Sequence, residues 1–326
     1  MKRTVQGKGK GKGKGSGGGK GKARGMAAKP ATPAGRSPLR MVPTVGATTA
    51  DELIDHPARW SRPHVRTLVL ASGKGGVGKS NCAANLAVAL GELGARVLLV
   101  DGDFAQANLD LLLGIHPRFD VQHLLAGEKA PEEIVVAGPR NVRLVPAASG
   151  APELSDLDDV RREIVVRAIS QLEADADLVL IDAASGVGRS VTSLCLSADD
   201  VVVVTTPEMP AFSDAYSLIK LLQQQGLQQP PHLLVNMAGT PEEAEETAHR
   251  IRLVSRRFLR LEVDSWGHVP FDPTIGRAVR RQEPVVTAFP QSPAALAYRA
   301  LAARLWQRAQ PQPPQDVESA PERLEA

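Results

Sequence analysis

The feature that most constrains this chain is a glycine-rich loop between an apolar segment and a segment rich in Ala and Leu. Residues 72–80 read Ser-Gly-Lys-Gly-Gly-Val-Gly-Lys-Ser. The mostly apolar run 65–71 predicts a buried strand before the loop, and residues 81–93 predict a helix after it. A strand, a loop that ends in Gly-Lys-Ser and a helix are the context that a phosphate-binding P-loop requires. A glycine-rich turn between a core strand and a core helix is the structural alternative.

In this context each residue of the loop has an expected role. The glycines leave backbone N–H groups free to surround a phosphate chain, and the start of the helix adds the positive end of its dipole. Lys79 would contact the β- and γ-phosphates, and the Ser80 hydroxyl would bind Mg²⁺. The predicted nucleotide contacts from this loop are Gly75, Gly76, Val77, Gly78, Lys79, Ser80 and Asn81.

Strand-like and helix-like segments alternate along the rest of the chain. Strands are predicted at 65–71, 96–100, 142–146, 178–181, 201–205, 232–235 and 261–269. Helices are predicted at 157–174, 211–224, 241–259, 274–283 and 293–308. This alternation predicts an α/β fold, a doubly wound and mostly parallel sheet with helices on both faces.

Ligands of such sheets bind beyond the carboxyl ends of the strands, so the carboxylates there matter most. Asp182 ends the apolar strand 178–181, where a carboxylate would hold Mg²⁺ directly or through water. The loop 183–188 that follows is a candidate sensor of the terminal phosphate. An aspartate that ends a strand without binding a ligand is the alternative.

A second lysine, Lys74, precedes the glycines and gives Lys-Gly-Gly-x-Gly-Lys-Ser. This pattern resembles the deviant Walker A motif of the MinD/ParA family of P-loop ATPases. The resemblance implies a homodimer in the ATP-bound state, in which Lys74 crosses to the nucleotide of the other subunit. A second ammonium group there could neutralise charge that builds up on the phosphates. A solvated loop lysine is the alternative.

The segment 101–114 resembles the family's switch I, since it reads Asp-Gly-Asp-Phe-Ala-Gln-Ala-Asn-Leu-Asp followed by three leucines and a glycine. The resemblance implies that Asp103 positions or activates the attacking water, that Asp101 supports the metal site and that Asn108 contacts the phosphate region. An N-cap is the alternative for an aspartate in this loop. The predicted catalytic residues are Asp103, Lys74 and Lys79, and the predicted metal ligands are Ser80, Asp101 and Asp182.

The segment 236–239, Asn-Met-Ala-Gly, occupies the place of the base-reading loop. A guanine site of the Asn-Lys-x-Asp type would carry a carboxylate at Gly239, so the sequence indicates adenine, with Asn236 near the base. Residues 269–273 resemble the family's second base-contacting segment, which adds Pro270 and Asp272. The expected cofactors are ATP and Mg²⁺, and the expected reaction is hydrolysis of ATP to ADP and phosphate.

Charge is distributed unevenly along the 326 residues. Residues 1–40 hold twelve Lys and Arg and no acidic residue, which leaves 27 basic and 36 acidic residues in the remainder. The predicted organisation is a disordered Gly/Lys-rich arm at 1–45, a linker or short helix at 46–63, an ATPase domain at 64–308 and a disordered Pro-rich acidic tail at 309–326. The arm could attach to nucleic acid by neutralising phosphates. A solubilising tail and a contact with anionic lipid are the alternatives.

The cysteine and hydropathy patterns exclude several classes of protein. Cys82 and Cys195 stand far apart and form no Cys-x-x-Cys, which argues against a disulfide framework and against the iron–sulfur carriers that share this P-loop. No apolar stretch reaches about 18 residues, so no transmembrane segment is expected. The acidic tail is unsuited to anionic lipid, so membrane contact is not expected. A cytoplasmic location is expected.

Residues 205–220 and 125–129 look most like the flagellar-placement branch of the family, near MinD. Family members alternate between an ATP-bound dimer on a surface and an ADP-bound monomer, and a partner protein stimulates hydrolysis. ParA-like members hold DNA without sequence preference through basic residues late in the domain, although any one of these can equally belong to a solvated helix face. The candidates in this chain are Arg250, Arg256, Arg257, Arg280 and Arg281.

These observations favour a positioning ATPase that associates with the nucleoid and acts in division-site or large-assembly placement. One alternative is a regulator of flagellar number and placement that acts through protein partners. A metabolic P-loop ligase of the biotin or cobyrinate type is a third possibility, which would require a substrate pocket that the sequence does not reveal.

Overall fold

The computed structural model describes residues 65–104, 106–147 and 159–309. The predicted basic arm, the linker or short helix and the acidic tail lie outside these residues, so their boundaries stay predictions.

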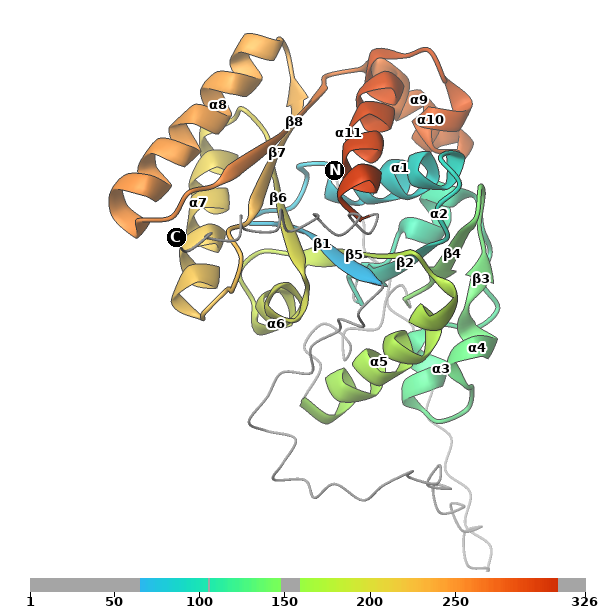
Figure 1. Ribbon diagram of the computed structural model, residues 1–326. Coiled ribbons are helices and arrows are strands. Elements are labelled where there is room, and N and C mark those ends of the chain that lie inside the picture. Colours follow the sequence, from blue (N-terminus) through green and yellow to red (C-terminus); the bar gives the residue numbers. More distant parts are fainter. Residues whose placement is uncertain (1–64, 105, 148–158, 310–326) are drawn as a thin grey trace, which may run out of the picture. The chain divides into compact units, whose positions relative to one another are not determined.

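An eight-stranded sheet in the order β3-β4-β2-β5-β1-β6-β7-β8 forms the centre of the described part (Figure 1). All neighbouring strands are parallel except β3 and β4, which are antiparallel. This arrangement confirms the predicted doubly wound α/β fold. The strands are β1 (Arg66–Ser72), β2 (Val97–Gly102), β3 (Val136–Ala137), β4 (Val142–Val145), β5 (Leu178–Ser185), β6 (Asp200–Thr205), β7 (His232–Ala238) and β8 (Asp264–Pro270).

Helices cover both faces of the sheet because apolar side chains of the central strands alternate between two cores. In β1, Val69 and Ala71 belong to the core under α5, α6, α7 and α8, whereas Leu68 and Leu70 belong to the core under α1, α9, α10 and α11. The helices are α1 (Lys79–Glu92), α2 (Leu109–Leu113), α3 (Val121–Leu125), α4 (Pro131–Ile134), α5 (Asp159–Leu172), α6 (Arg189–Ser197), α7 (Met209–Gln224), α8 (Pro241–Val254), α9 (Pro273–Arg281), α10 (Val285–Ala288) and α11 (Pro293–Ala309).

The structure departs from the sequence prediction mainly at short or irregular elements. The helix predicted at 241–259 ends as α8 at Val254 and continues as a π-helical turn, Ser255–Leu259. The strand predicted at 261–269 begins only at Asp264. The short helices α2, α3, α4 and α10 and the antiparallel strand β3 were not predicted, because two to five residues are too few to show a periodic pattern.

None of the described helices combines the length and the apolar character that crossing a bilayer requires.

Candidate active site

The glycine-rich loop connects β1 to α1 at the carboxyl edge of the sheet, where the sequence predicted a phosphate site. Gly78 precedes α1 with φ 80°, a left-handed conformation that glycine adopts without steric cost. A Cβ at Gly78 would lie 2.4 Å from Nδ2 of Asn236, and a Cβ at Gly73 would lie 2.1 Å from the backbone oxygen of Asp214 on α7. Close contacts therefore require glycine at both positions, and the left-handed backbone requires it at Gly78 as well.

Lys79 and Asp182 form a buried ion pair at the base of the loop. The Lys79 Nζ donates to Asp182 Oδ1 at 2.5 Å, and the two side chains are 5% and 0% exposed. The contact forms because β5 is the neighbour of β1 in the sheet, with Asp182 in register with Leu70. Burial raises the pKa of Asp182, while the charge and hydrogen bond of Lys79 and a hydrogen bond from Ser80 oppose that rise. The second carboxylate oxygen of Asp182 is buried without a hydrogen-bond partner among the described residues.

Asp101 lies beside Asp182 on the next strand, β2, and organises the loop that carries Asp103. Its carboxylate accepts hydrogen bonds from the backbone N–H groups of Asp103, Asn108 and Leu109 at 3.1–3.2 Å. Burial, followed by the negative charge of Asp182, raises the pKa of Asp101 to about 7, although these backbone hydrogen bonds lower it. The structure therefore shows Asp101 as a buried support of the loop, next to the predicted metal site.

Asp103 lies in the loop that follows β2. It is partly exposed, and its Oδ1 accepts from the backbone N–H of Gln106 at 3.1 Å. Asn108 precedes α2 as its N-cap residue, and its backbone N–H is held by Asp101. The loop residues thus leave much of the Asp103 carboxylate available, while Asn108 is fixed through its main chain.

Lys74 is held much more loosely than Lys79. Its Nζ lies 3.7 Å from a carboxylate oxygen of Glu208, and the two side chains are 33% and 70% exposed. Glu208 follows the end of β6, the neighbour of β1 on the other side from β5, and the sequence reasoning assigned it no role. Its position just after a strand end in the central sheet was the signal that could have found it.

Asn236 has a structural contact that its predicted role near the base did not anticipate. Its Nδ2 donates to the backbone oxygen of Val77 at 2.8 Å, so the end of β7 is tied to the phosphate loop. Its Oδ1 is buried and has no hydrogen-bond partner among the described residues. Asn236 therefore lies at the phosphate loop, where its amide nitrogen fixes the shape of the loop, and its contact with the base stays a prediction.

The two other predicted base contacts lie at the end of β8 and the start of α9. Pro270 is in register with Ala238 of β7, near the loop that begins with Asn236. Asp272 is the N-cap of α9, and its carboxylate accepts from the Thr274 N–H at 2.8 Å and from the Ala294 N–H at 3.1 Å. Helix capping is the role that the structure shows for Asp272, and base contact by either residue stays a prediction.

These residues fit a nucleotide phosphate chain with Mg²⁺. The loop offers backbone N–H groups, and a Cβ added at Gly76 would meet no atom within 4 Å, so space beside the backbone is open for a ligand. Ser80 and Asp182 supply a hydroxyl and a carboxylate, the oxygen ligands that Mg²⁺ prefers, and one oxygen of Asp182 lacks a partner. The Lys79 ammonium can exchange its contact with Asp182 for a contact with a phosphate.

Comparison with known proteins gives the family. A family model named ParA, described as NUBPL iron-transfer P-loop NTPase, matches residues 64–306. The chain belongs to the ParA family of P-loop NTPases. This confirms the resemblance to MinD/ParA ATPases on which the sequence analysis relied.

Individual members of the ParA family resemble this chain over most of their length. The antiactivator FleN of Pseudomonas aeruginosa is 36% identical over 241 residues, which span 74% of this chain and 86% of FleN. The flagellum site-determining protein YlxH of Helicobacter pylori is 29% identical, over 68% of this chain and 76% of YlxH. The structure of the septum site-determining protein MinD of Pyrococcus horikoshii with Mg-ADP superimposes with a TM-score of 0.62 at 29% identity, over 75% of this chain and 97% of MinD.

The cysteines of this ParA-family chain do not suit the iron transfer that the family description mentions. Cys82 on α1 and Cys195 on α6 are both fully buried. Burial raises the pKa of each thiol to about 12, which keeps both sulfurs protonated, whereas a metal is bound by the thiolate. The Sγ of Cys82 instead lies 3.6 Å from the hydroxyl of Tyr298 on α11.

The predicted DNA-contacting arginines lie over opposite faces of the sheet. α8 and the π-helical turn pack on one core and α9 packs on the other, and Figure 1 shows them on either side of β7 and β8. Arg250 and Arg256 have carboxylate partners, Glu246 and Glu262. Within the described residues, Arg257 and Arg280 have no ion pair, and Arg281 lies over the ring of Phe289 at 4.8 Å. The structure therefore divides these side chains into two groups.

Proposed function

We propose that this chain is an ATP-hydrolysing, dimerising switch that positions a large assembly in the cell. The observation that carries the proposal is the buried contact of Lys79 with Asp182 at the base of the P-loop, beside the loop of Asp103. The names of its relatives support the class of process, since MinD is described as septum site-determining and YlxH as flagellum site-determining. The MinD structure with Mg-ADP supports ATP and Mg²⁺ as the cofactors.

Each step of the proposed cycle uses a residue of the site. ATP with Mg²⁺ supplies the hydrolysable phosphoanhydride and the charge that balances the phosphates. Lys79 would move from Asp182 to the β- and γ-phosphates, and Asp182 with Ser80 would hold the metal ion. Asp103 orients the attacking water, and Lys74 leaves Glu208 for the nucleotide of the second subunit. A partner protein stimulates hydrolysis, which returns the two subunits to the monomeric state.

Substitution of Asp103 and Lys74 tests this cycle. Asp103→Ala should bind ATP and dimerise but not hydrolyse, and Lys74→Ala should bind ATP as a monomer and also not hydrolyse. Lys220→Ala, a change of an exposed lysine on α7, is the matched control. Dimerisation is measured by light scattering with ATP, and turnover by phosphate release. Normal turnover in Asp103→Ala, or a stable ATP dimer of Lys74→Ala, would overturn the role given to that residue.

The surface to which the dimer binds is proposed to be the nucleoid. The support is charge, since the basic residues of segment 1–40 and of the two arginine groups can neutralise DNA phosphates. Affinity for DNA of random sequence should fall steeply with salt, and each phosphate contact that is removed should lower the slope of log K against log salt by about 0.9. Arg257→Gln with Arg280→Gln should lower this slope, whereas Arg118→Gln with Arg140→Gln should not. A salt-independent affinity excludes the nucleoid.

A flagellar regulator that acts through protein partners is the second candidate, and FleN and YlxH favour it by their names. In that case the switch would oppose an activator or place a flagellum, and DNA would be no partner of the isolated protein. A fluorescent fusion separates the two candidates. Localisation over the nucleoid or at midcell, made stronger by Asp103→Ala, supports division-site placement, and polar localisation with altered flagellar number supports the second candidate.

A further inference from the structure

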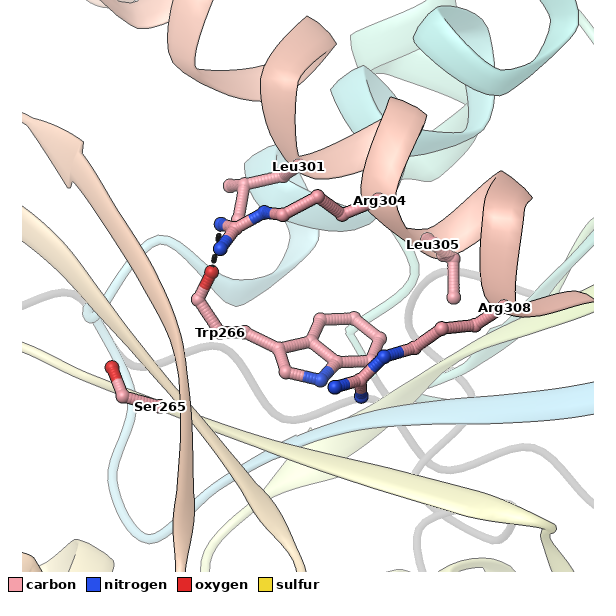
Figure 2. A pocket seen from close by; sticks show the side chains of 6 residues that line it. All are labelled: Ser265, Trp266, Leu301, Arg304, Leu305 and Arg308. Atoms are coloured by element: carbon pink, nitrogen blue, oxygen red, sulfur yellow. Dashed lines mark hydrogen bonds between the residues drawn. The ribbon is translucent and has the colours of Figure 1, made fainter.

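A small pocket lies between the edge strand β8 and helix α11. It is near the start of β8, whereas the P-loop follows the carboxyl end of β1. Ser265 and Trp266 of β8 line it, together with Leu301, Arg304, Leu305 and Arg308 of α11 (Figure 2). Its cavity volume is about 50 Å³. A water molecule takes up about 30 Å³ in the liquid, so the pocket has room for a group of a few heavy atoms.

The pocket contains a buried donor without an acceptor. Trp266 is 7% exposed, and its ring N–H has no hydrogen-bond partner among the described residues. A buried N–H that is left unpaired costs free energy, and most such groups in folded proteins are paired. The position of Trp266 in the wall of a cavity therefore points to a ligand that supplies an acceptor.

The charged side chains around the indole select an anionic acceptor. Arg304 uses one nitrogen to donate to the backbone oxygen of Trp266, and it has no ion pair in the described part of the chain. Arg308 has a single long contact, 3.4 Å to a carboxylate oxygen of Asp264, and is 51% exposed. Figure 2 shows both side chains reaching from α11 toward Trp266, Arg304 to its backbone oxygen and Arg308 to its indole ring. Two guanidinium groups beside one carboxylate leave a net positive site, and a guanidinium pairs well with a planar carboxylate.

The chain itself has a source of such a group beside the pocket. Ala309, the last residue of α11, follows Arg308, and residues 310–326 then contain four acidic residues and one arginine. Asp316 is the first of these acids, and seven residues can span roughly 23–25 Å when extended. Arg304 lies five residues before Ala309, or about 7.5 Å along the helix. The direct linkage gives an effective concentration of about millimolar, at which even a weak contact is populated.

We propose that the pocket between β8 and α11 is a carboxylate-binding site and that an acidic side chain of segment 310–326 occupies it. The carboxylate accepts hydrogen bonds from the indole N–H of Trp266 and from the guanidinium of Arg308.

The indole proton of Trp266 reports occupancy directly, because a hydrogen bond to a carboxylate moves its NMR resonance downfield. The full chain has three tryptophans, so its ¹H–¹⁵N spectrum has three indole signals, and Trp266→Phe identifies the relevant one. Neutralising the tail should shift this signal upfield and leave that of Trp306 in place. The tail variant is Asp316→Asn with Glu318→Gln, Glu322→Gln and Glu325→Gln. The matched control neutralises four exposed acids far from the pocket, Glu128→Gln, Glu132→Gln, Glu245→Gln and Glu283→Gln.

A second variant tests the pocket side of the contact. Arg308→Gln should reproduce the upfield shift, and combining it with the neutral tail should add no further shift, because both changes remove one interaction. An unchanged Trp266 signal in the neutral-tail variant overturns the tail as the occupant. If acetate or inorganic phosphate then shifts the signal of the wild-type chain, the site takes an anion from another source. If neither anion does, the pocket is not an anion site.

Discussion

The buried pair of Lys79 and Asp182 makes the strongest quantitative prediction. At 2.5 Å and an effective dielectric constant of about 20, the two charges attract each other by about 7 kcal/mol. Removing both charges from water costs several kcal/mol per ion, so the pair contributes little net stability. Removing one partner is different, since it leaves the other charge buried without compensation, at a cost of about 3–5 kcal/mol.

The two single variants should therefore be unequally unstable. Asp182→Asn leaves a buried ammonium and should lose about 3–5 kcal/mol of unfolding free energy, or roughly 6–20 °C in Tm for a domain of this size. Lys79→Met should lose less, because burial already raises the pKa of Asp182 and the lone carboxyl can take up a proton. The double variant Lys79→Met with Asp182→Leu should recover most of the wild-type stability, because an apolar pair of similar volume needs no compensation.

Urea unfolding of the four proteins, with and without Mg-ATP, measures this cycle. The wild type should gain about 2.7 kcal/mol at a nucleotide concentration of 100 Kd, and the double variant should gain nothing although it is folded. A double variant that loses as much stability as the two single variants together would show that the residues are not coupled. Lys79 and Asp182 would then not stabilise the fold through one shared interaction.

Three further predictions concern the surroundings of the pair. Gly73→Ala should cost about 3 kcal/mol or more in urea unfolding, since its Cβ would lie 2.1 Å from the backbone oxygen of Asp214. Gly75→Ala should be almost neutral, because the nearest atom to its Cβ would be the Ser185 Oγ at 3.9 Å. Asn236→Ala removes the bond to the phosphate loop and should weaken ATP binding about tenfold, or about 1.4 kcal/mol, by calorimetry; unchanged affinity would contradict this tethering role. Because the pKa of Asp101 is raised to about 7, the folded state keeps this carboxyl protonated up to about pH 7, whereas the unfolded state releases the proton above about pH 4. The free energy of unfolding should therefore fall by up to about 4 kcal/mol between about pH 4 and 7. Asp101→Asn should remove this fall, and an equal slope in wild type and variant would refute the assignment.

The positions of the P-loop and of Asp182 in the fold are those that local pattern and sheet order determine. The P-loop follows from the glycines and the flanking strand and helix. The sequence predicts Asp182 at the end of a strand, whereas β5 continues through Asp182 to Ser185, because these residues still pair with the neighbouring strand β1. Even so, the direct contact of Lys79 with Asp182 could not be predicted, because the two residues are 103 positions apart and meet only through the register of β1 and β5.

The roles that the sequence could not supply depend on hydrogen bonds between distant segments. Asn236 reaches Val77 across 159 positions, and Asp272 accepts from the Ala294 N–H as well as from its own helix. Asp101 occupies a motif position that predicts a metal ligand, yet its carboxylate oxygens accept hydrogen bonds from three backbone N–H groups. A residue type indicates which ligands a side chain can bind, but the surrounding groups decide whether its polar atoms are available to bind them.

The two lysines of the loop show how such surroundings suit two different tasks. Lys79 is buried against a carboxylate, so it can leave Asp182 only when another strong anion takes its place, which links its movement to phosphate binding. Lys74 is paired at 3.7 Å with a carboxylate that is 70% exposed, and contacts of that kind are worth about 0–1 kcal/mol. Lys74 can therefore leave its own subunit at almost no cost. The crossing proposed for Lys74 needs this freedom, because any stability that Lys74 contributes to the monomer would be subtracted from the dimer.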